Sequence, residues 1–337
     1  MKFGPVPVDQ AEGKILAHNI ARRDGHRAFR KGKMISAADV TALHEEGYVT
    51  VYVAELEVGD EDENSTAAAI ARTALGVGVT LKGLSAGRAN LAAMFRGVLY
   101  VDAARLEQVN SCEGVAFATL RSYAQVQPEQ IVATVKIISY GVSAAVLAQA
   151  EAAARDARDA RGAAGLIQVG ELKPRKVGII YSGMPAAREK VMNSFEPALR
   201  KRIGALGSHI ESVEYIFLEG QEDDAAMAQA LARQVERGSE VIILASETPT
   251  VDRRDIAPRS VESLGGQVIS VGAPVDPGTL LMLAYLGERP VLGVPGFVRS
   301  PKTNVVDWVL PALLAGIHLN AADIARMGYG GLMDKNP

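Results

Sequence analysis

Between residues 176 and 294, short apolar runs alternate with longer stretches in which apolar residues recur every three or four positions. The runs predict buried strands, and the recurrence predicts amphipathic helices. Strands are expected at Lys176–Tyr181, Ile210–Leu218, Glu240–Ala245, Gln267–Val271 and Pro290–Val294. Helices are expected between them at Ala187–Leu206, Asp223–Arg237 and Ser260–Leu264. This alternation predicts an α/β fold, a three-layer αβα domain with a mostly parallel sheet and right-handed crossovers.

The last two predicted strands lie closer together in the sequence than the others. Leu280–Leu286 and Pro290–Val294 are separated by Gly287-Glu288-Arg289 alone, which is too short for a crossover helix. We therefore expect a hairpin added to the parallel sheet, with a helix at Asn304–Gly316 covering it.

The first half of the chain is less regular, and we expect an α+β region there. The pattern predicts an amphipathic helix within Val8–Ile20, a helix at Ala37–Glu46 capped by Ser36, and strands at Thr50–Ala54 and Ile131–Ile138. The acidic residues 60–67 are expected to form a loop.

Residues 143–164 are rich in alanine with interleaved arginine and aspartate, which predicts a solvated helix or a helical linker. We place the main boundary after it, with an N-terminal region at 1–172 and the α/β domain at 173–337.

Net charge, apolar stretches and the numbers of cysteines and histidines exclude several classes of protein and of site. The net charge of −3 over 337 residues gives no support for nucleic-acid or membrane binding driven by global charge. The start of the chain lacks the apolar core of a signal peptide, and the uncharged stretch Trp308–Ala322 is shorter than the ~18 residues needed to span a bilayer. We expect a cytoplasmic protein. The single cysteine, Cys112, excludes an internal disulfide and a zinc site built from several thiolates, and the scattered histidines show no ligand spacing.

Polar loops follow four of the predicted strands. They contain Ser182-Gly183, Ser246–Asp255, Gly272–Gly278 and Pro295–Asn304. Turns need such residues in any case, but parallel strands place their loops at one edge of the sheet, where open α/β folds bind ligands. Neither a P-loop nor a G-x-G-x-x-G turn is present, so a P-loop NTPase or a standard dinucleotide dehydrogenase is not expected.

The order of these loops resembles the molybdopterin-binding domain shared by molybdopterin adenylyltransferases and molybdopterin molybdotransferases. Arg253–Pro258 (RRDIAP) is similar to the Arg-Asp-Val-Thr-Pro segment of the adenylyltransferases. Pro274–Gly278 (PVDPG) and Pro290–Gly296 (PVLGVPG) are similar to the Lys-Pro-Gly and Leu-Pro-Gly segments of the molybdotransferases. The resemblance covers Lys173–Gly316 well.

The start of the chain, over Val6–Ile20 and Arg30–Val53, is similar to a shortened molybdotransferase. The ending RSPKTNVVDWVLPALLAG is similar to that of a bacterial subgroup sometimes fused to a molybdenum cofactor cytidylyltransferase. The resemblance is fair over Met1–Glu57 and poor between there and Lys173.

The resemblance implies a pocket for molybdopterin at the carboxyl edge of the sheet. Arginine suits the phosphate because its guanidinium binds in a bidentate manner. The residues implied to bind the cofactor are Ser182, Gly183, Ser246, Thr248, Arg253, Arg254, Pro277, Gly278, Pro295, Gly296, Arg299 and Ser300.

The resemblance also implies that Asp252, Asp255 and Asp223 are catalytic. Asp252 and Asp255 are the candidate ligands of Mg²⁺, since hard cations take oxygen ligands. Two other interpretations stay open at this point. In the first, Arg253 and Arg254 form surface ion pairs with these aspartates. In the second, Glu222-Asp223 only cap a helix.

One departure changes the expected chemistry. The family's Gly-Gly-x-(Gly/Ser) loop is replaced here by Ser246-Glu247-Thr248-Pro249. Glycines let backbone N–H groups close around a phosphate, whereas Glu247 would repel one. We therefore do not expect adenylyl transfer from ATP.

Two functional hypotheses remain. One is a molybdotransferase-like protein acting in or beside molybdate insertion, and the other is a non-catalytic carrier that delivers the cofactor to a cytidylyltransferase or an apo-molybdoenzyme. A relic fold with a regulatory binding role is a third interpretation. The resemblance also suggests a homodimer, because molybdotransferase-like proteins are dimers.

Overall fold

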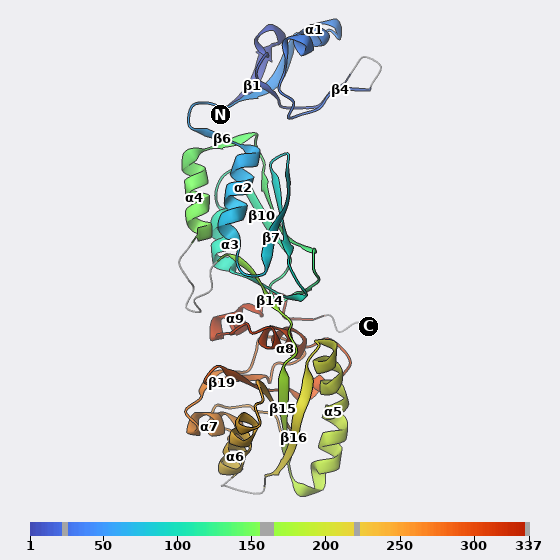
Figure 1. The fold of residues 1–337 in the computed structure, drawn as a ribbon, viewed down its shortest axis with the longest axis vertical. Coiled ribbons are helices and arrows are strands. Elements are labelled where there is room, and N and C mark those ends of the chain that lie inside the picture. Colours follow the sequence, from blue (N-terminus) through green and yellow to red (C-terminus); the bar gives the residue numbers. More distant parts are fainter. Residues whose placement is uncertain (22–25, 156–164, 219–222, 334–337) are drawn as a thin grey trace. The chain divides into compact units, whose positions relative to one another are not determined.

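A computed structural model of the chain describes residues 1–21, 26–155, 165–218 and 223–333 (Figure 1). The chain divides into two compact units. The first comprises Met1–Ser122 and Val126–Val169, and the second comprises Tyr123–Gln125 and Gly170–Pro337. Helices and strands alternate in the second unit, and the predicted α/β class is confirmed.

The second unit contains a six-stranded sheet in the order β16-β15-β17-β20-β19-β18. Strands β16, β15, β17 and β20 are parallel neighbours, whereas β19 is antiparallel to both β18 and β20. The predicted hairpin is therefore confirmed. The strands are β15 (Lys176–Gly183), β16 (His209–Phe217), β17 (Val241–Ser246), β18 (Gln267–Val271), β19 (Met282–Leu286) and β20 (Arg289–Gly293).

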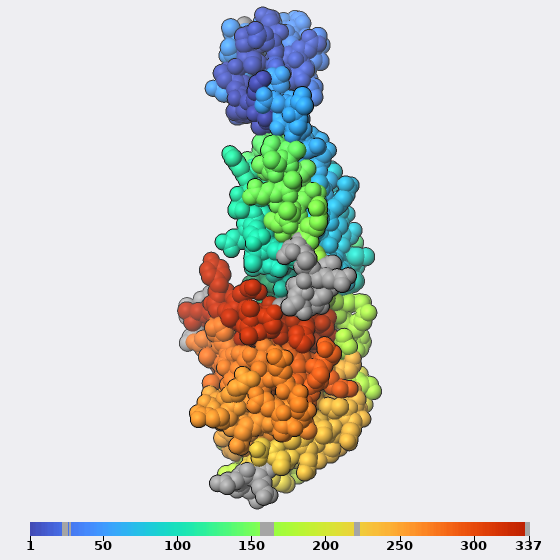
Figure 2. Space-filling model, turned by 90° about the vertical axis from the view of Figure 1, so that its left-hand side faces the viewer, coloured from blue at the N-terminus to red at the C-terminus, as the bar shows by residue number. Residues whose placement is uncertain are grey.

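Helices cover both faces of this sheet (Figure 1). Helices α6 (Asp223–Glu236) and α7 (Ile256–Ser263) share a core with inward-facing residues of β15, β17 and β20. The opposite face is covered by α5 (Arg188–Ala205), whose buried residues recur at the predicted four-residue spacing: Val191, Phe195, Leu199 and Ile203. Helices α8 (Val306–Leu314) and α9 (Ala321–Arg326) complete the unit. The side that carries α7 faces the viewer as the orange surface in Figure 2.

The first unit starts with a small sheet, β1 (Lys2–Pro7), β5 (Thr50–Glu55) and β2 (Ile15–Leu16), and a helix, α1 (Ala37–Glu45). Ser36 caps α1 as predicted, in a capping box with Asp39. The short pair β3 (Ile20–Ala21) and β4 (Arg27–Phe29) lies between them in the chain.

The amphipathic helix predicted within Val8–Ile20 is wrong. A single 3₁₀ turn, η1 (Val8–Gln10), is followed by strand β2. Gly13 has a φ of 74°, which ends any helix, and the N–H of Leu16 donates to the carbonyl of Lys33 at 2.8 Å. Tertiary backbone pairing therefore replaces the helix that the apolar spacing suggested.

The rest of the first unit has a separate core of helices packed on strands. Its sheets have the orders β10-β12-β8-β7, β11-β9-β14 and β13-β6. The elements are β6 (Asp60–Asp62), α2 (Glu63–Ala74), β7 (Val79–Ser85), β8 (Arg88–Ala93), β9 (Gly97–Val101), α3 (Ala103–Asn110), β10 (Val115–Thr119), β11 (Gln125–Val126), β12 (Ile131–Ile137), β13 (Gly141–Ser143), α4 (Ala144–Arg155) and β14 (Ile167–Glu171).

Two further predictions in this unit need correction. The loop expected at residues 60–67 is instead strand β6 and the start of α2, because Asp62 caps the helix through the N–H groups of Asn64 and Ser65. The exposed helix expected from residue 143 is α4, whose residues Ala150 and Ala154 are fully buried in the core. The rest of that expected helix, residues 156–164, lies outside the described residues. Within the described ranges, no helix has both the length and the apolarity to span a membrane.

Candidate functional site

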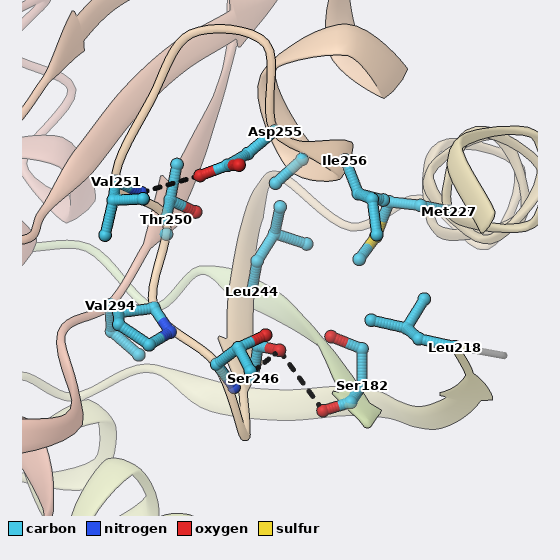
Figure 3. A pocket seen from close by; sticks show the side chains of 14 residues that line it. Ser182, Leu218, Met227, Leu244, Ser246, Thr250, Val251, Asp255, Ile256 and Val294 are labelled. Carbon is cyan, nitrogen blue, oxygen red and sulfur yellow. Dashed lines mark hydrogen bonds between the residues drawn. The ribbon is translucent and has the colours of Figure 1, made fainter. Parts of the chain in front are cut away.

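Two cavities lie near the carboxyl ends of β15, β17 and β20. The first has a volume of about 300 Å³, and its lining includes Ser182, Leu218, Leu244, Thr248, Asp255 and Val294 (Figure 3). The second has a volume of about 320 Å³, and its lining includes Lys190, Ser194, Phe195, Glu247, Phe297 and Arg299. Ser246 and Pro249 line both, so the loop after β17 forms a wall of each cavity. The predicted gathering of loops at this edge is thus observed for three of the strands.

Ser182 supplies a buried hydroxyl to the first cavity. Its residue is 1% exposed, and its carbonyl accepts hydrogen bonds from the Ser246 hydroxyl at 3.3 Å and from the N–H of Glu247 at 3.0 Å. Among the described residues, the Ser182 hydroxyl itself has no partner, and it faces the cavity (Figure 3). A buried hydroxyl without a protein partner is a ready hydrogen-bonding group for a ligand.

Asp255 holds the shape of the loop that walls the first cavity. Its Oδ2 accepts hydrogen bonds from the N–H of Val251 at 2.7 Å and from that of Asp252 at 3.0 Å. Asp255 is the N-cap residue of α7, yet its side chain binds no N–H of that helix. The second carboxylate oxygen has no hydrogen-bond partner in the described part of the chain and is available at the cavity.

Arg253 and Arg254, both predicted to bind phosphate, line neither cavity. Arg254 Nε donates to Asp252 Oδ1 at 2.7 Å, while Arg253 donates to Glu262 Oε1 and to the carbonyl of Val268, both at 3.1 Å. Surface ion pairing, the alternative that the sequence left open, is what the structure shows for Arg254 with Asp252. Arg253 pairs instead with a residue of α7.

Both candidate ligands of Mg²⁺ take part in hydrogen bonds within the protein. Asp252 is engaged by the side chain and the backbone N–H of Arg254, and Asp255 uses one oxygen for the loop. No group of three histidine, cysteine, aspartate or glutamate side chains in the described ranges is placed to hold a metal ion. Mg²⁺ binding by Asp252 and Asp255 stays a prediction.

The ion pair of Asp252 leads to a pH prediction. The Arg254 side chain, followed by its backbone N–H, lowers the pKa of Asp252 from 3.8 to about 2. The pairing is therefore complete at neutral pH and is lost only as the pH falls through the depressed pKa. We expect an NMR titration of Asp252 with a midpoint near that value, and Arg254→Ala should return it towards 3.8. Equal midpoints in the two proteins would contradict the pairing.

Arg299 dominates the second cavity. Its Nε donates to the carbonyl of Gly296 at 2.8 Å, and its guanidinium lies over the ring of Phe195, with 5.2 Å to the centroid. No carboxylate of the described residues forms an ion pair with it. Gly296 also lines this cavity, and the carbonyl of Pro295 caps the η3 turn (Gly296–Arg299) by accepting from the N–H of Val298 at 3.0 Å.

Ser300 and Thr248 are used within their own loops. The Ser300 hydroxyl accepts from the N–H of Lys302 at 3.2 Å, and the N–H of Thr248 donates to the Ser246 hydroxyl at 3.3 Å. Thr248 lines the first cavity, and Ser300 lines neither.

Gly183 makes room for Glu247. A Cβ at position 183 would lie 2.9 Å from the Tyr215 hydroxyl, closer than real Cβ contacts, and 3.1 Å from the Glu247 Cβ, which is tighter than most. Burial, and next the charge of Glu247, raises the pKa of Tyr215. Gly183 therefore acts by its small size, which leaves room for Glu247 directly after β17.

Pro277, Gly278 and Asp223 are not part of either cavity. The carbonyl of Pro277 accepts from the N–H of Val305 at 3.2 Å, and Gly278, with a φ of 122°, packs on Val305. Asp223 is the first residue of α6, and Glu222 lies outside the described residues, so the capping interpretation stays a prediction.

Sequence reasoning missed the contribution of α5 to the site. Lys190, Ser194 and Phe195 line the second cavity from the first two turns of this helix. A signal was present, since a helix that follows a parallel strand directly begins at the carboxyl edge of the sheet.

A family model described as a domain of unknown function (DUF8806) matches residues 5–55. A search of curated proteins finds no match. Among solved structures, the chain is similar to MoaB from Thermus thermophilus, with 16% identity, 42% of this chain and 97% of that chain covered, and a TM-score of 0.30. It is also similar to MoeA from Pyrococcus horikoshii, with 14% identity, 96% and 77% covered, and a TM-score of 0.32.

A third similar structure is Mog from Mycobacterium ulcerans, with 15% identity, 43% of this chain and 99% of that chain covered, and a TM-score of 0.28. All three are molybdopterin biosynthesis proteins. At identities and TM-scores this low, the similarity does not establish a function for this chain.

Proposed function

We propose that the protein binds molybdopterin or the molybdenum cofactor and works in molybdenum cofactor biosynthesis, in or beside molybdate insertion. One observation carries this proposal. Ser246 and Pro249 line two cavities of different chemistry, with hydroxyl and apolar groups and Asp255 in the first, and with two cations, aromatic rings and Glu247 in the second. Molybdopterin has a planar heterocycle at one end and a phosphate at the other, which matches this pair.

The first cavity suits the heterocycle. The edge of a pterin carries N–H donors and ring acceptors, and the free oxygen of Asp255 accepts while the Ser182 hydroxyl does either. Leu244 and Val294 provide apolar contacts for the ring. Ligand pockets commonly combine apolar walls with a few placed polar groups in this way.

The second cavity suits the phosphate. Arg299 offers a guanidinium that forms no ion pair with a carboxylate of the described residues, and Lys190 of α5 adds a second cation to the lining. A charge-assisted bond to a phosphate is stronger than a neutral hydrogen bond. The resemblance of the strand-end loops to the molybdopterin-binding domain also supports a phosphate site at this edge of the sheet.

A carrier without turnover is the second candidate, and a specific observation favours it. Asp252 and Asp255, the carboxylates proposed as catalysts, are engaged with Arg254 and with the loop backbone. Such a carrier would deliver the cofactor to a cytidylyltransferase or an apo-molybdoenzyme. A homodimer stays a prediction.

Calorimetry tests the proposed function. We expect micromolar or tighter binding of molybdopterin and weak or undetectable binding of ATP-Mg²⁺. A triphosphate carries more negative charge than a monophosphate, Glu247 lines the second cavity, and Pro249 has no N–H to donate. The double variant Glu247→Gly, Pro249→Gly should improve nucleotide binding.

Glu247→Gln alone serves as the matched control, because it removes the charge and leaves the backbone unchanged. No binding of molybdopterin would refute the proposed function. Tight binding of ATP by the unaltered protein, with release of pyrophosphate when molybdopterin is added, would instead identify an adenylyltransferase.

A further inference from the structure

The segment that carries Arg299 is held by one side chain of α5, that of Arg202. Its Nη1 donates to the carbonyl of Val298 at 2.9 Å, and its Nη2 donates to the carbonyl of Ser300 at 3.0 Å and to that of Lys302 at 3.3 Å. The first two carbonyls belong to the residues on either side of Arg299. The backbone is thus fixed both before and after the residue that reaches the second cavity.

A carboxylate anchors the same guanidinium. Arg202 Nε donates to Asp307 Oδ1 at 2.8 Å, and Asp307 Oδ2 accepts from the N–H of Asn304 at 2.9 Å. Asn304 is fully buried, accepts from the N–H of Val306 at 3.0 Å and donates to the carbonyl of Lys302 at 3.2 Å. The Arg202 side chain is only 12% exposed, so these bonds are little weakened by solvent.

We propose that Arg202 is a positioning residue that places the guanidinium of Arg299 at the second cavity. This inference rests on the proposed role of that cavity in binding a phosphorylated pterin. Arg202 lines neither cavity and acts through the backbone of residues 298–302. Arg299 is then restrained from three directions, by Arg202 through its own backbone, by the carbonyl of Gly296 and by the ring of Phe195.

Only an arginine meets these acceptors together. A guanidinium presents five N–H donors in a planar fork, whereas a lysine offers a single compact charge on a flexible stem. Removing the guanidinium leaves the carbonyls of Val298 and Ser300 and the carboxylate of Asp307 short of a donor. The segment then loses the hydrogen bonds that tie its backbone to Arg202 of α5.

The test is a double-mutant cycle with a matched control. Arg202→Gln should weaken binding of molybdopterin about 5- to 20-fold, but should have no further effect in an Arg299→Ala background, because the coupling runs through Arg299. Arg175→Gln is the control, since Arg175 also pairs with a carboxylate, Glu240 at 2.6 Å, and donates to a backbone carbonyl, that of Leu314 at 3.4 Å. It lines neither cavity, and we expect stability to fall and affinity to stay unchanged.

Amide hydrogen exchange without ligand provides the second readout. The N–H groups of Val298 and Ser300 should exchange about tenfold faster in Arg202→Gln than in the unaltered protein, and no faster in Arg175→Gln. If the unaltered protein binds no molybdopterin, the proposed function is refuted. Amide hydrogen exchange alone then tests whether Arg202 fixes the backbone of residues 298–302. Unchanged exchange, an affinity loss fully additive with Arg299→Ala, or an equal loss in Arg175→Gln would overturn the inference.

Discussion

Replacing Arg299 by alanine should weaken binding of molybdopterin by about 1.5–3 kcal/mol, or roughly 10- to 150-fold in Kd, the usual contribution of a hydrogen bond to a charged group. The reason is that Arg299 brings to the second cavity a guanidinium that forms no ion pair with a carboxylate of the described residues. Calorimetry on the two proteins measures the change. The unfolding temperature should move little, since Arg299 is exposed and its main protein contact is one carbonyl.

Arg254→Ala is the matched control for this experiment. Arg254 lies in the motif that resembles the adenylyltransferases, but its guanidinium is paired with Asp252 and lines neither cavity. We expect its removal to leave the Kd unchanged. If Arg254→Ala weakens binding as strongly as Arg299→Ala, the phosphate is bound by the loop after β17 and not by the second cavity.

Substitution of Asp255 should separate its two roles. In Asp255→Asn the amide oxygen can still accept from the N–H groups of Val251 and Asp252, while the amide NH₂ replaces the acceptor that faces the first cavity. Affinity for molybdopterin should then fall about 10- to 100-fold with little change in stability. Asp255→Ala should lose affinity as well, and its free energy of unfolding should drop by about 1–3 kcal/mol.

Denaturant unfolding and calorimetry on both variants measure these changes. Asp252→Asn is the control, because it disturbs an exposed ion pair next to the same loop, and we expect no change in affinity. Wild-type affinity in Asp255→Asn would show that Asp255 only shapes the loop and that the pterin binds elsewhere.

Most of the second unit could be predicted from the sequence. The apolar runs that became β15 and β17, and the four-residue spacing of α5, record burial on one or both faces of a local element. Parallel direction then followed from the alternation of strands and helices, and with it the edge at which the loops meet. The sequence pattern predicts Ser182, Ser246 and Asp255 at that edge, and all three line one cavity in the structure.

In the first unit, local sequence patterns predicted some elements wrongly. The apolar residues between Val8 and Ile20 have a helix-like spacing, but Gly13 and backbone bonds to a distant strand decide for an extended chain. Asp62 lies in a stretch whose polar composition predicts a loop, but it caps helix α2. Local composition does not say whether a polar residue faces solvent or satisfies a helix end.

Sequence by itself determined the order of strands and helices in the second unit and the edge that carries its loops. Only the tertiary structure decided which of its arginines faces a cavity. Arg253 pairs with Glu262, Arg254 pairs with Asp252, and Arg299 lies at the second cavity on a segment whose backbone accepts hydrogen bonds from Arg202 of α5. The physical reason is that burial recurs with the period of each element, whereas the pairing of charges depends on distances between elements far apart in the chain.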